Sequence, residues 1–203
     1  MKILTHVTIS MILYGHFKKK MKLNRLSFIY GNIKPDLSYK QIKTAHIMEN
    51  HFGNVCESVN ELMQNNMDRQ KFSTELGQIC HYVSDFFCRY HLDREIFHKL
   101  GGHFLYEIRL QFLMWKLLSR NQLDYMPKKE RKERRNIASI LLEMRSNYIS
   151  ETAALEKDLV YALSTALWIG ESVGYYLAKA AEPVRESEMA MDCYAMLPMT
   201  GGK

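Results

Sequence analysis

The sequence predicts an all-α fold, a single-domain helical bundle of about five to seven helices. Apolar residues recur every three or four positions along most of the chain, and no stretch keeps the alternation of a β-strand for long. Proline, which interrupts helices, occurs only four times in 203 residues. Because 47% of the residues are hydrophobic and 25% are charged, the chain has the composition of a globular protein with a buried core.

The first expected helix covers residues 3–17, and residues 18–37 are expected to be irregular. Pro35 fixes its own φ and disfavours a helix at the residue before it, so Asp36 is expected in a turn. Ser38 is a suitable N-cap for a long helix that runs to about residue 66 and carries His46 and His51. Five residues separate these histidines on a helix, so at most one of them is expected to be a ligand.

The second half of the chain is expected to be helical as well. In order we expect a central helix from Ser73 or Thr74 to about residues 89–93, a helix from Gly101 through Leu118, a polar connection at 121–135, and helices at about 136–148 and 151–180. The domain would cover residues 1–182, with Pro183 ending the last helix and a loose tail at 183–203.

The net charge of +6 is concentrated in one segment, residues 128–135 (KKERKERR), where six cations and two acids give +4. Such a patch weakly favours anionic partners, although most charge runs are simply solvated. The apolar run at the N-terminus is too short to cross a bilayer, and its cations follow it instead of preceding it, so we expect a cytoplasmic protein. The four cysteines form no CxxC pair and are expected to be reduced.

All eight histidines lie within the first 103 residues, which assigns the chemistry to the N-terminal half. His81 and Asp85 lie four residues apart in an apolar helix, and His103 and Glu107 repeat this spacing. A buried imidazole and a buried carboxylate each need a partner, and a divalent metal satisfies both. Taken alone, either pair is also consistent with a hydrogen-bonded or surface pair. Together they predict a multinuclear metal site held by helices.

The order and spacing of these residues resemble the zinc-dependent phospholipases C, all-α enzymes with three zinc ions. The most specific part is His81-x3-Asp85-x5-His91 followed by His103-x3-Glu107, within a segment that begins LGQICHYVSDFFCRYH. Pro35-Asp36 and Thr44-Ala-His46 are consistent with the earlier motifs of the family. The resemblance covers about residues 5–110.

The resemblance implies a role for each of the ligand-type residues. One zinc would use His46, His81 and Asp85 with Asp36 at or next to it, a second would share Asp85 and use His6, and a third would use His91, His103 and Glu107. Asp36 would be the general base. Secreted members complete the His6-side site with a processed N-terminal tryptophan, whereas this chain starts at Met1, as short members without a signal peptide do. Whether the Met1 amine or solvent replaces it, or the site stays empty, is left open, so two or three zinc ions are expected.

The predicted function is that of a zinc-dependent phosphodiester hydrolase acting on a phospholipid or related phosphodiester, with transient contact to a membrane surface. Single-strand-specific zinc nucleases share this kind of site, so nucleic acid is the closest alternative substrate. A zinc-binding helical protein without catalysis is the alternative from another class. The remaining histidines, His16, His51 and His98, are expected to be structural or on the surface. The sequence does not predict an oligomeric state.

Overall fold

The helices form one bundle, which the computed structural model describes over residues 1–38, 45–64, 67–92, 100–120 and 136–180. Within these ranges there are α1 (Ile3–Phe17), α2 (Arg25–Leu37), α4 (Met48–Gln64), α5 (Arg69–Phe86), the short 3-10 helix η1 (Arg89–His91), α7 (Leu100–Ser119), α8 (Ile137–Ser150) and α9 (Leu155–Ala180). No strand occurs in the described ranges, so the all-α prediction is confirmed.

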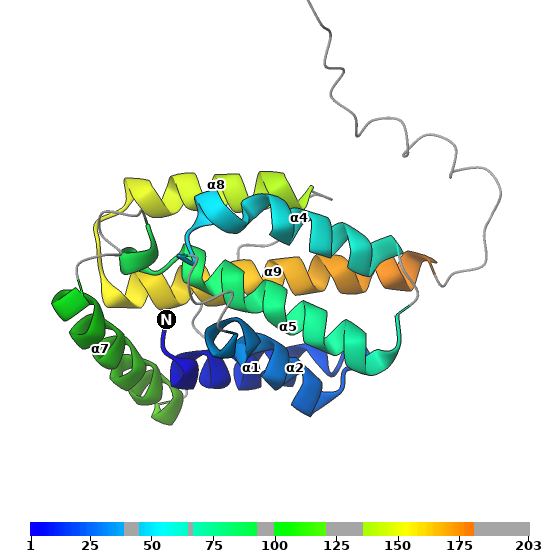
Figure 1. Ribbon diagram of the computed structural model, residues 1–203, viewed down its shortest axis with the longest axis horizontal. Helices are drawn as coiled ribbons and strands as arrows, with labels where there is room; N and C mark the ends of the chain where they lie inside the picture. Colours follow the sequence, from blue (N-terminus) through cyan, green and yellow to red (C-terminus); the bar gives the residue numbers. More distant parts are fainter. Residues whose placement is uncertain (39–44, 65–66, 93–99, 121–135, 181–203) are drawn as a thin grey trace, which may run out of the picture.

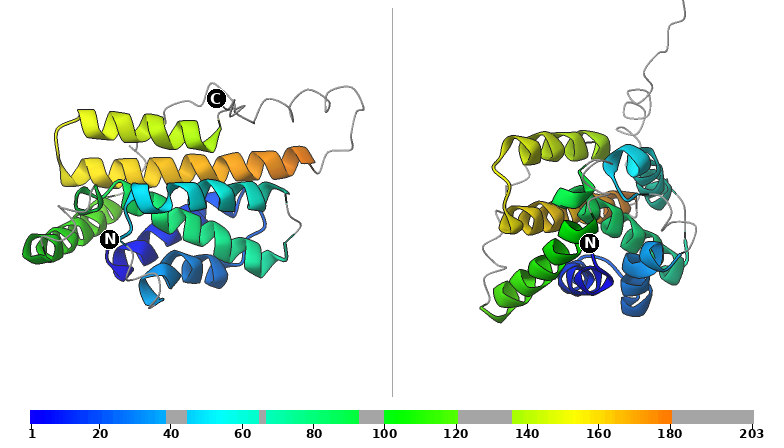
Figure 2. Two further views of the ribbon diagram at one scale, coloured as in Figure 1. Left: turned by 45° about the horizontal axis from the view of Figure 1, so that its top comes forward. Right: turned by 60° about the vertical axis from the view of Figure 1, so that its left-hand side comes forward.

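Helices α5 and α9 run through the middle of the bundle (Figure 1). On one side lie α4 and α8, on the other lie α1 and α2, and α7 crosses one end. Figure 2 shows α8 lying along α9. Residues at three- and four-residue spacing on α1, such as Ile9, Leu13 and Phe17, are fully buried against this centre. Phe17 lies so close to α9 that a Cβ atom at Gly170 would come within 2.2 Å of its ring.

Side-chain caps fix where several helices begin. The Asn24 side chain accepts a hydrogen bond from the Ser27 amide at 3.0 Å and starts α2. Asp68 accepts from two amides in the first turn of α5, and Asn136 accepts from the Ala138 amide at the start of α8. These are the side chains that most often satisfy the free amides of a helix N-terminus. The caps therefore set the register in which α2 and α5 present their polar residues.

Helices α2 and α5 pack with their backbones in contact, which two glycines permit. A Cβ atom at Gly31 would lie 2.1 Å from the Thr74 carbonyl oxygen, and one at Gly77 would lie 2.4 Å from the Phe28 carbonyl oxygen. Neither distance is compatible with a side chain, because backbone atoms cannot move aside as a flexible side chain can. This contact sets the spacing between Asp36 on α2 and His81 on α5.

Two sequence-based expectations are wrong in the region before α5. Residues 25–37 are helical, with Pro35 inside the last turn, because the Asn24 cap and the packing on α5 outweigh the local preference of the residue before proline. Asp36 is therefore in the last helical turn, not in a loop. Ser38 is the C-cap of α2, and the next described helix begins at Met48, so His46 precedes that helix.

The other boundaries agree with the sequence to different degrees. Helix α5 begins at Arg69, before the expected Ser73 or Thr74, since Asp68 is its cap. It ends at Phe86, earlier than expected, and His91 lies in η1. The expected α7, α8 and α9 are confirmed within a few residues. The basic segment 128–135, the connection 121–135, Pro183 and the tail 183–203 lie outside the described residues, as does His98. None of the described helices has the length and apolar character needed to cross a bilayer.

Candidate metal centre

The structure brings all eight predicted site residues into one cluster at the end of the bundle where α1, α5 and α7 meet. The contributing elements are α1 (His6), α2 (Asp36), the segment before α4 (His46), α5 (His81 and Asp85), η1 (His91) and α7 (His103 and Glu107). Their donor atoms fall into three groups, each within 4.8 Å: His6, His81 and Asp85; Asp36, His46 and His81; and His91, His103 and Glu107.

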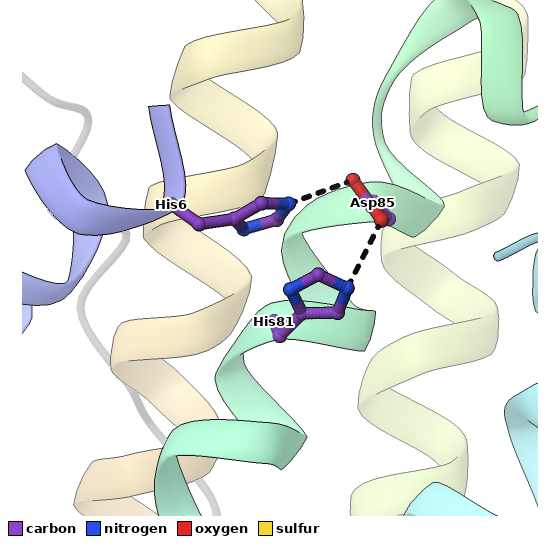
Figure 3. A group of neighbouring side chains, drawn as sticks. All are labelled: His6, His81 and Asp85. Carbon is purple, nitrogen blue, oxygen red and sulfur yellow. Dashed lines mark ion pairs between the residues drawn. The ribbon is translucent and has the colours of Figure 1, made fainter. Parts of the chain in front are cut away.

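Asp85 occupies the centre of the cluster and is fully buried. Its Oδ1 atom lies 3.3 Å from His6 Nε2, while its Oδ2 atom lies 3.2 Å from His46 Nδ1 and 3.4 Å from His81 Nε2. Figure 3 shows the rings of His6 and His81 directed at opposite oxygens of this carboxylate. The same carboxylate is therefore shared between two sets of imidazoles, which is the arrangement of a bridging ligand.

Backbone carbonyls orient two of the imidazoles. His81 Nδ1 lies 2.7 Å from the carbonyl oxygen of Asn32 on α2, so this nitrogen carries the proton and donates it. Nε2 of His81 is then left as the lone-pair nitrogen that faces the cluster. His91 Nδ1 lies 3.2 Å from the carbonyl oxygen of His46. Hydrogen bonds of this kind hold a metal-binding histidine in one tautomer and one ring orientation.

The amino group of Met1 also reaches the cluster. Its nitrogen lies 2.5 Å from Asp85 Oδ1, 3.2 Å from His91 Nε2 and 3.4 Å from Glu107 Oε1. Burial alone would lower the pKa of this amine, but Asp85 and the other nearby acidic groups outweigh burial and raise its pKa to about 11. The carboxylates thus stabilise a positive charge at the point where the first and third groups meet.

Several buried polar atoms of the cluster have no hydrogen-bond partner among the described residues. Nδ1 of His6 and Nε2 of His46 are in this position, whereas Nε2 of His6 and Oδ2 of Asp36 make ion-pair contacts but no hydrogen bond. A buried imidazole or carboxylate without a partner is unfavourable by about 1–3 kcal/mol or more. A divalent metal would satisfy such atoms, so the residues present fit a metal cluster better than a set of hydrogen-bonded pairs.

The electrostatics of His81 and Asp85 favour the protonation states that bind metal. Burial lowers the pKa of His81 well below its usual value, which keeps the imidazole neutral. Burial would raise the pKa of Asp85, but His91, the Met1 amine and His6 outweigh it, so the pKa lies well below the usual range and the carboxylate is charged. Neutral imidazoles beside a charged carboxylate are what a metal ion requires.

The third group is assembled by α7 and η1. His103 Nε2 lies 3.1 Å from Glu107 Oε1 one turn along α7, and the His103 ring stacks on Tyr90 with 5.0 Å between centroids. Burial would raise the pKa of Glu107, but its contacts with His103 and His91 lower it below the usual value. At 13% and 14% exposed, Glu107 and His103 lie at the accessible edge of the cluster.

Asp36 lies at that accessible edge as well, 18% exposed, and its geometry differs from that of Asp85. Its Oδ1 atom lies 3.7 Å from both His46 Nδ1 and His81 Nε2, which is longer than a hydrogen bond. Burial, together with the neighbouring charge of Asp85, raises the pKa of Asp36. A partly exposed carboxylate with a raised pKa is suited to accept a proton.

Some residues around the cluster were not evident from the sequence. His51, expected to be structural, packs its ring against His46 with 5.6 Å between centroids, and it belongs to none of the three groups. The argument that five-residue spacing on a helix separates these two histidines does not apply, because His46 precedes the helix that carries His51. The contact of Asn32 with His81 could not be predicted, because Asn32 uses its backbone carbonyl, a group that every residue has. Asp158 on α9 accepts hydrogen bonds from the Arg89 amide at 2.8 Å and from the Tyr106 hydroxyl, which ties α9 to η1 and α7.

The all-α bundle thus gathers five histidines and three carboxylates in three adjoining groups, each of which could hold a metal ion. Residues 5–162 match the family described as zinc dependent phospholipase C. The chain therefore belongs to that family, and the match reaches beyond the expected 5–110 into α9. Family membership confirms the resemblance and assigns zinc as the metal on which the family depends. Comparisons with curated proteins and with solved structures gave no match.

Proposed function

We propose that the protein is a zinc-dependent phosphodiester hydrolase that acts on a phospholipid or a related phosphodiester. Family membership supports a phospholipase-type function for the site. The observation that carries the proposal is the set of unpartnered imidazole nitrogens on His6 and His46 beside a central, charged Asp85. A metal would satisfy these atoms, and Asp36 lies next to them at an accessible edge.

Each zinc would be held by one of the three groups described above. His81 belongs to two of them, and Asp85 lies between His6 and His46, so the first two ions would be neighbours. Because His91, His103 and Glu107 come from η1 and α7, the third ion would depend on how α7 packs. Zinc lowers the pKa of water that it binds and neutralises the charge of phosphate oxygens.

Asp36 would act as the general base of the hydrolysis. The Asp36 carboxylate takes a proton from the attacking water, whose oxygen forms the new bond to phosphorus. The bond between phosphorus and the oxygen of the leaving alcohol breaks, and that oxygen receives a proton. Asp36 is suited to this role because it is partly exposed and its pKa is raised, so it can both accept and return a proton.

Metal content and turnover measured on the same samples test the proposal. We expect two or three zinc ions per chain by mass spectrometry, and hydrolysis of phosphatidylcholine or a soluble chromogenic phosphodiester that a chelator abolishes. Asp36→Asn should lower kcat by roughly a hundredfold to ten-thousandfold, the range for a general base, while most of the zinc remains bound. Glu171→Gln is the control, because Glu171 is a partly buried carboxylate paired with His16 and Lys20 away from the cluster.

The outcomes separate the three functions considered. Turnover of single-stranded DNA in place of both phosphodiesters would assign the site to a nuclease. Zinc-loaded protein that hydrolyses none of the three substrates would support a non-catalytic metal-binding protein. Purified protein without zinc that also fails to bind added zinc would exclude all three.

A further inference from the structure

The outward face of α7 carries exposed apolar side chains directly behind the metal cluster. Leu105, Ile108, Phe112 and Trp115 follow one another at three- and four-residue spacing, so they share one side of the helix. Phe112 is 62% exposed and Trp115 is 43% exposed. Ile108, between Leu105 and Phe112, is half-buried. Side chains of this size are usually buried in a helix of a soluble bundle, so three exposed on one face indicate a surface for interaction.

Helix α1 extends this surface. Leu4 and Met11 lie seven residues apart on its exposed side and are 50% and 49% exposed. The two helices are joined by a hydrogen bond of 2.7 Å from the Thr5 hydroxyl to the Gln111 side chain. On each helix the exposed apolar residues lie on the outer side of this contact, as helical spacing requires. We name the combined surface, made by Leu4, Met11, Leu105, Ile108, Phe112 and Trp115, the α1–α7 face.

Among the described residues of α1 and α7, the charges beside the α1–α7 face are cationic. Arg109, Lys116 and Arg120 are exposed and follow the apolar residues along α7. The only acidic residue of α7 is Glu107, which lies in the cluster, and α1 contains none. A helix with Trp and Phe on its apolar side and Lys and Arg beside them has the composition of one that lies in a lipid interface.

We infer that the α1–α7 face docks the protein on the surface of an anionic phospholipid bilayer. The choice of a bilayer rests on the proposed function, because a phospholipid substrate has to be met at such a surface. Charge favours a bilayer over a second copy of the chain as the partner of this face. In a symmetric dimer, Arg109 and Lys116 would approach cations of the other copy, whereas an anionic bilayer attracts them. The opposite side of α7 carries His103 and Glu107, so a bilayer docked on this face would lie about one helix diameter from the cluster.

Vesicle co-sedimentation tests the inference. Vesicles of phosphatidylcholine with phosphatidylserine should bind the protein more strongly than phosphatidylcholine alone, and salt should weaken the binding. The double variant Phe112→Ser/Trp115→Ser should lower the partition coefficient at least about tenfold. The matched control is Leu142→Ser/Ile149→Ser on α8, which removes two side chains that are 56% and 62% exposed on another side of the bundle and should bind as the wild type does.

Charge reversal and fluorescence give independent readouts. Arg109→Glu/Lys116→Glu should lower binding to the phosphatidylserine vesicles by roughly tenfold or more and bring it to the level seen with phosphatidylcholine alone. The chain contains two tryptophans, Trp115 and Trp168, so a Trp168→Phe variant reports on the α1–α7 face alone. Brominated lipid should quench its emission.

Failure of this inference can be told from failure of the proposed function, because binding is measured in a chelator without turnover. A protein that binds vesicles but hydrolyses no phosphodiester would keep the docking surface and lose the proposed function. Equal vesicle binding by Phe112→Ser/Trp115→Ser and its α8 control would overturn the docking surface. So would a wild-type dimer in light scattering that this variant converts to a monomer, since the face would then bind a second copy. Hydrolysis of the soluble phosphodiester should be unchanged in the variant.

Discussion

Replacing His81 by alanine tests the metal cluster most sharply, because His81 is the one residue shared by two of the three donor groups. At a free zinc concentration about a hundredfold above the dissociation constant, each filled site adds about 2.7 kcal/mol to the free energy of unfolding. Three sites would add about 8 kcal/mol, and loss of the two that use His81 would leave about 2.7 kcal/mol. For a domain of this length, 1 kcal/mol changes the melting temperature by about 2–4 °C.

The measurement compares melting temperatures with zinc and with a chelator for three proteins. Zinc should raise the melting temperature of the wild type by about 16–32 °C and that of His81→Ala by about 5–11 °C, since one zinc site remains in the variant. His51→Ala is the matched control: it removes another buried imidazole, which stacks on Tyr82 but belongs to no donor group. It should lower stability and keep the full zinc-dependent increase. An unchanged increase in His81→Ala, or an equal loss in both variants, would refute the assignment of His81 to two metal sites.

Three further predictions concern the third group, a buried carboxylate and the contact between α2 and α5. His103→Ala should lower the zinc content by one ion per chain in mass spectrometry and leave the ions that use His81, because its donor group is separate. Burial raises the pKa of Asp158 from 3.8 to about 7, so the folded state holds a proton that the unfolded state releases. The free energy of unfolding should therefore fall by up to about 4 kcal/mol as the pH rises from about 4 to 7. Urea unfolding of Asp158→Asn should lack this decrease. Gly77→Ala should destabilise the protein by several kcal/mol, as much as other overpacking substitutions or more, because the new Cβ atom would collide with the Phe28 carbonyl. Gly15→Ala is the control in the same urea titration. It should be neutral or stabilising, because no atom lies within 4 Å of the new Cβ.

The sequence predicted those parts of the site that depend on local spacing. His81 with Asp85 and His103 with Glu107 are each one turn apart on a helix, so their alignment needs no knowledge of the tertiary structure. The structure also places His91 within the cluster although η1, not the central helix, carries it. Metal binding by these residues stays a prediction until zinc is measured.

Parts of the site that depend on contacts between helices were not predictable in the same way. Pro35 indicated a turn because the rule for the residue before proline is local, whereas α2 is held by its cap and by contact with α5. The placement of His46 outside a helix was missed for the related reason that Ser38 can cap a helix or end one. The exposed apolar face of α7 was not predicted either, since helical spacing does not tell which of two apolar sides of a helix is exposed.

The α2–α5 contact links the backbone packing to the chemistry of the site. Gly31 and Gly77 let the two backbones touch, and that approach brings the Asn32 carbonyl within 2.7 Å of His81 Nδ1. The hydrogen bond places the proton on Nδ1 and leaves Nε2 with a free lone pair, 3.4 Å from Asp85 Oδ2 and 3.0 Å from His46 Nδ1. A chain with the same ligand residues but a larger side chain at either glycine would separate α2 from α5 and leave His81 without its orienting carbonyl. The spacing of ligands along the sequence is therefore necessary for this cluster but not sufficient, because the two glycines determine whether His81 can serve both of its groups.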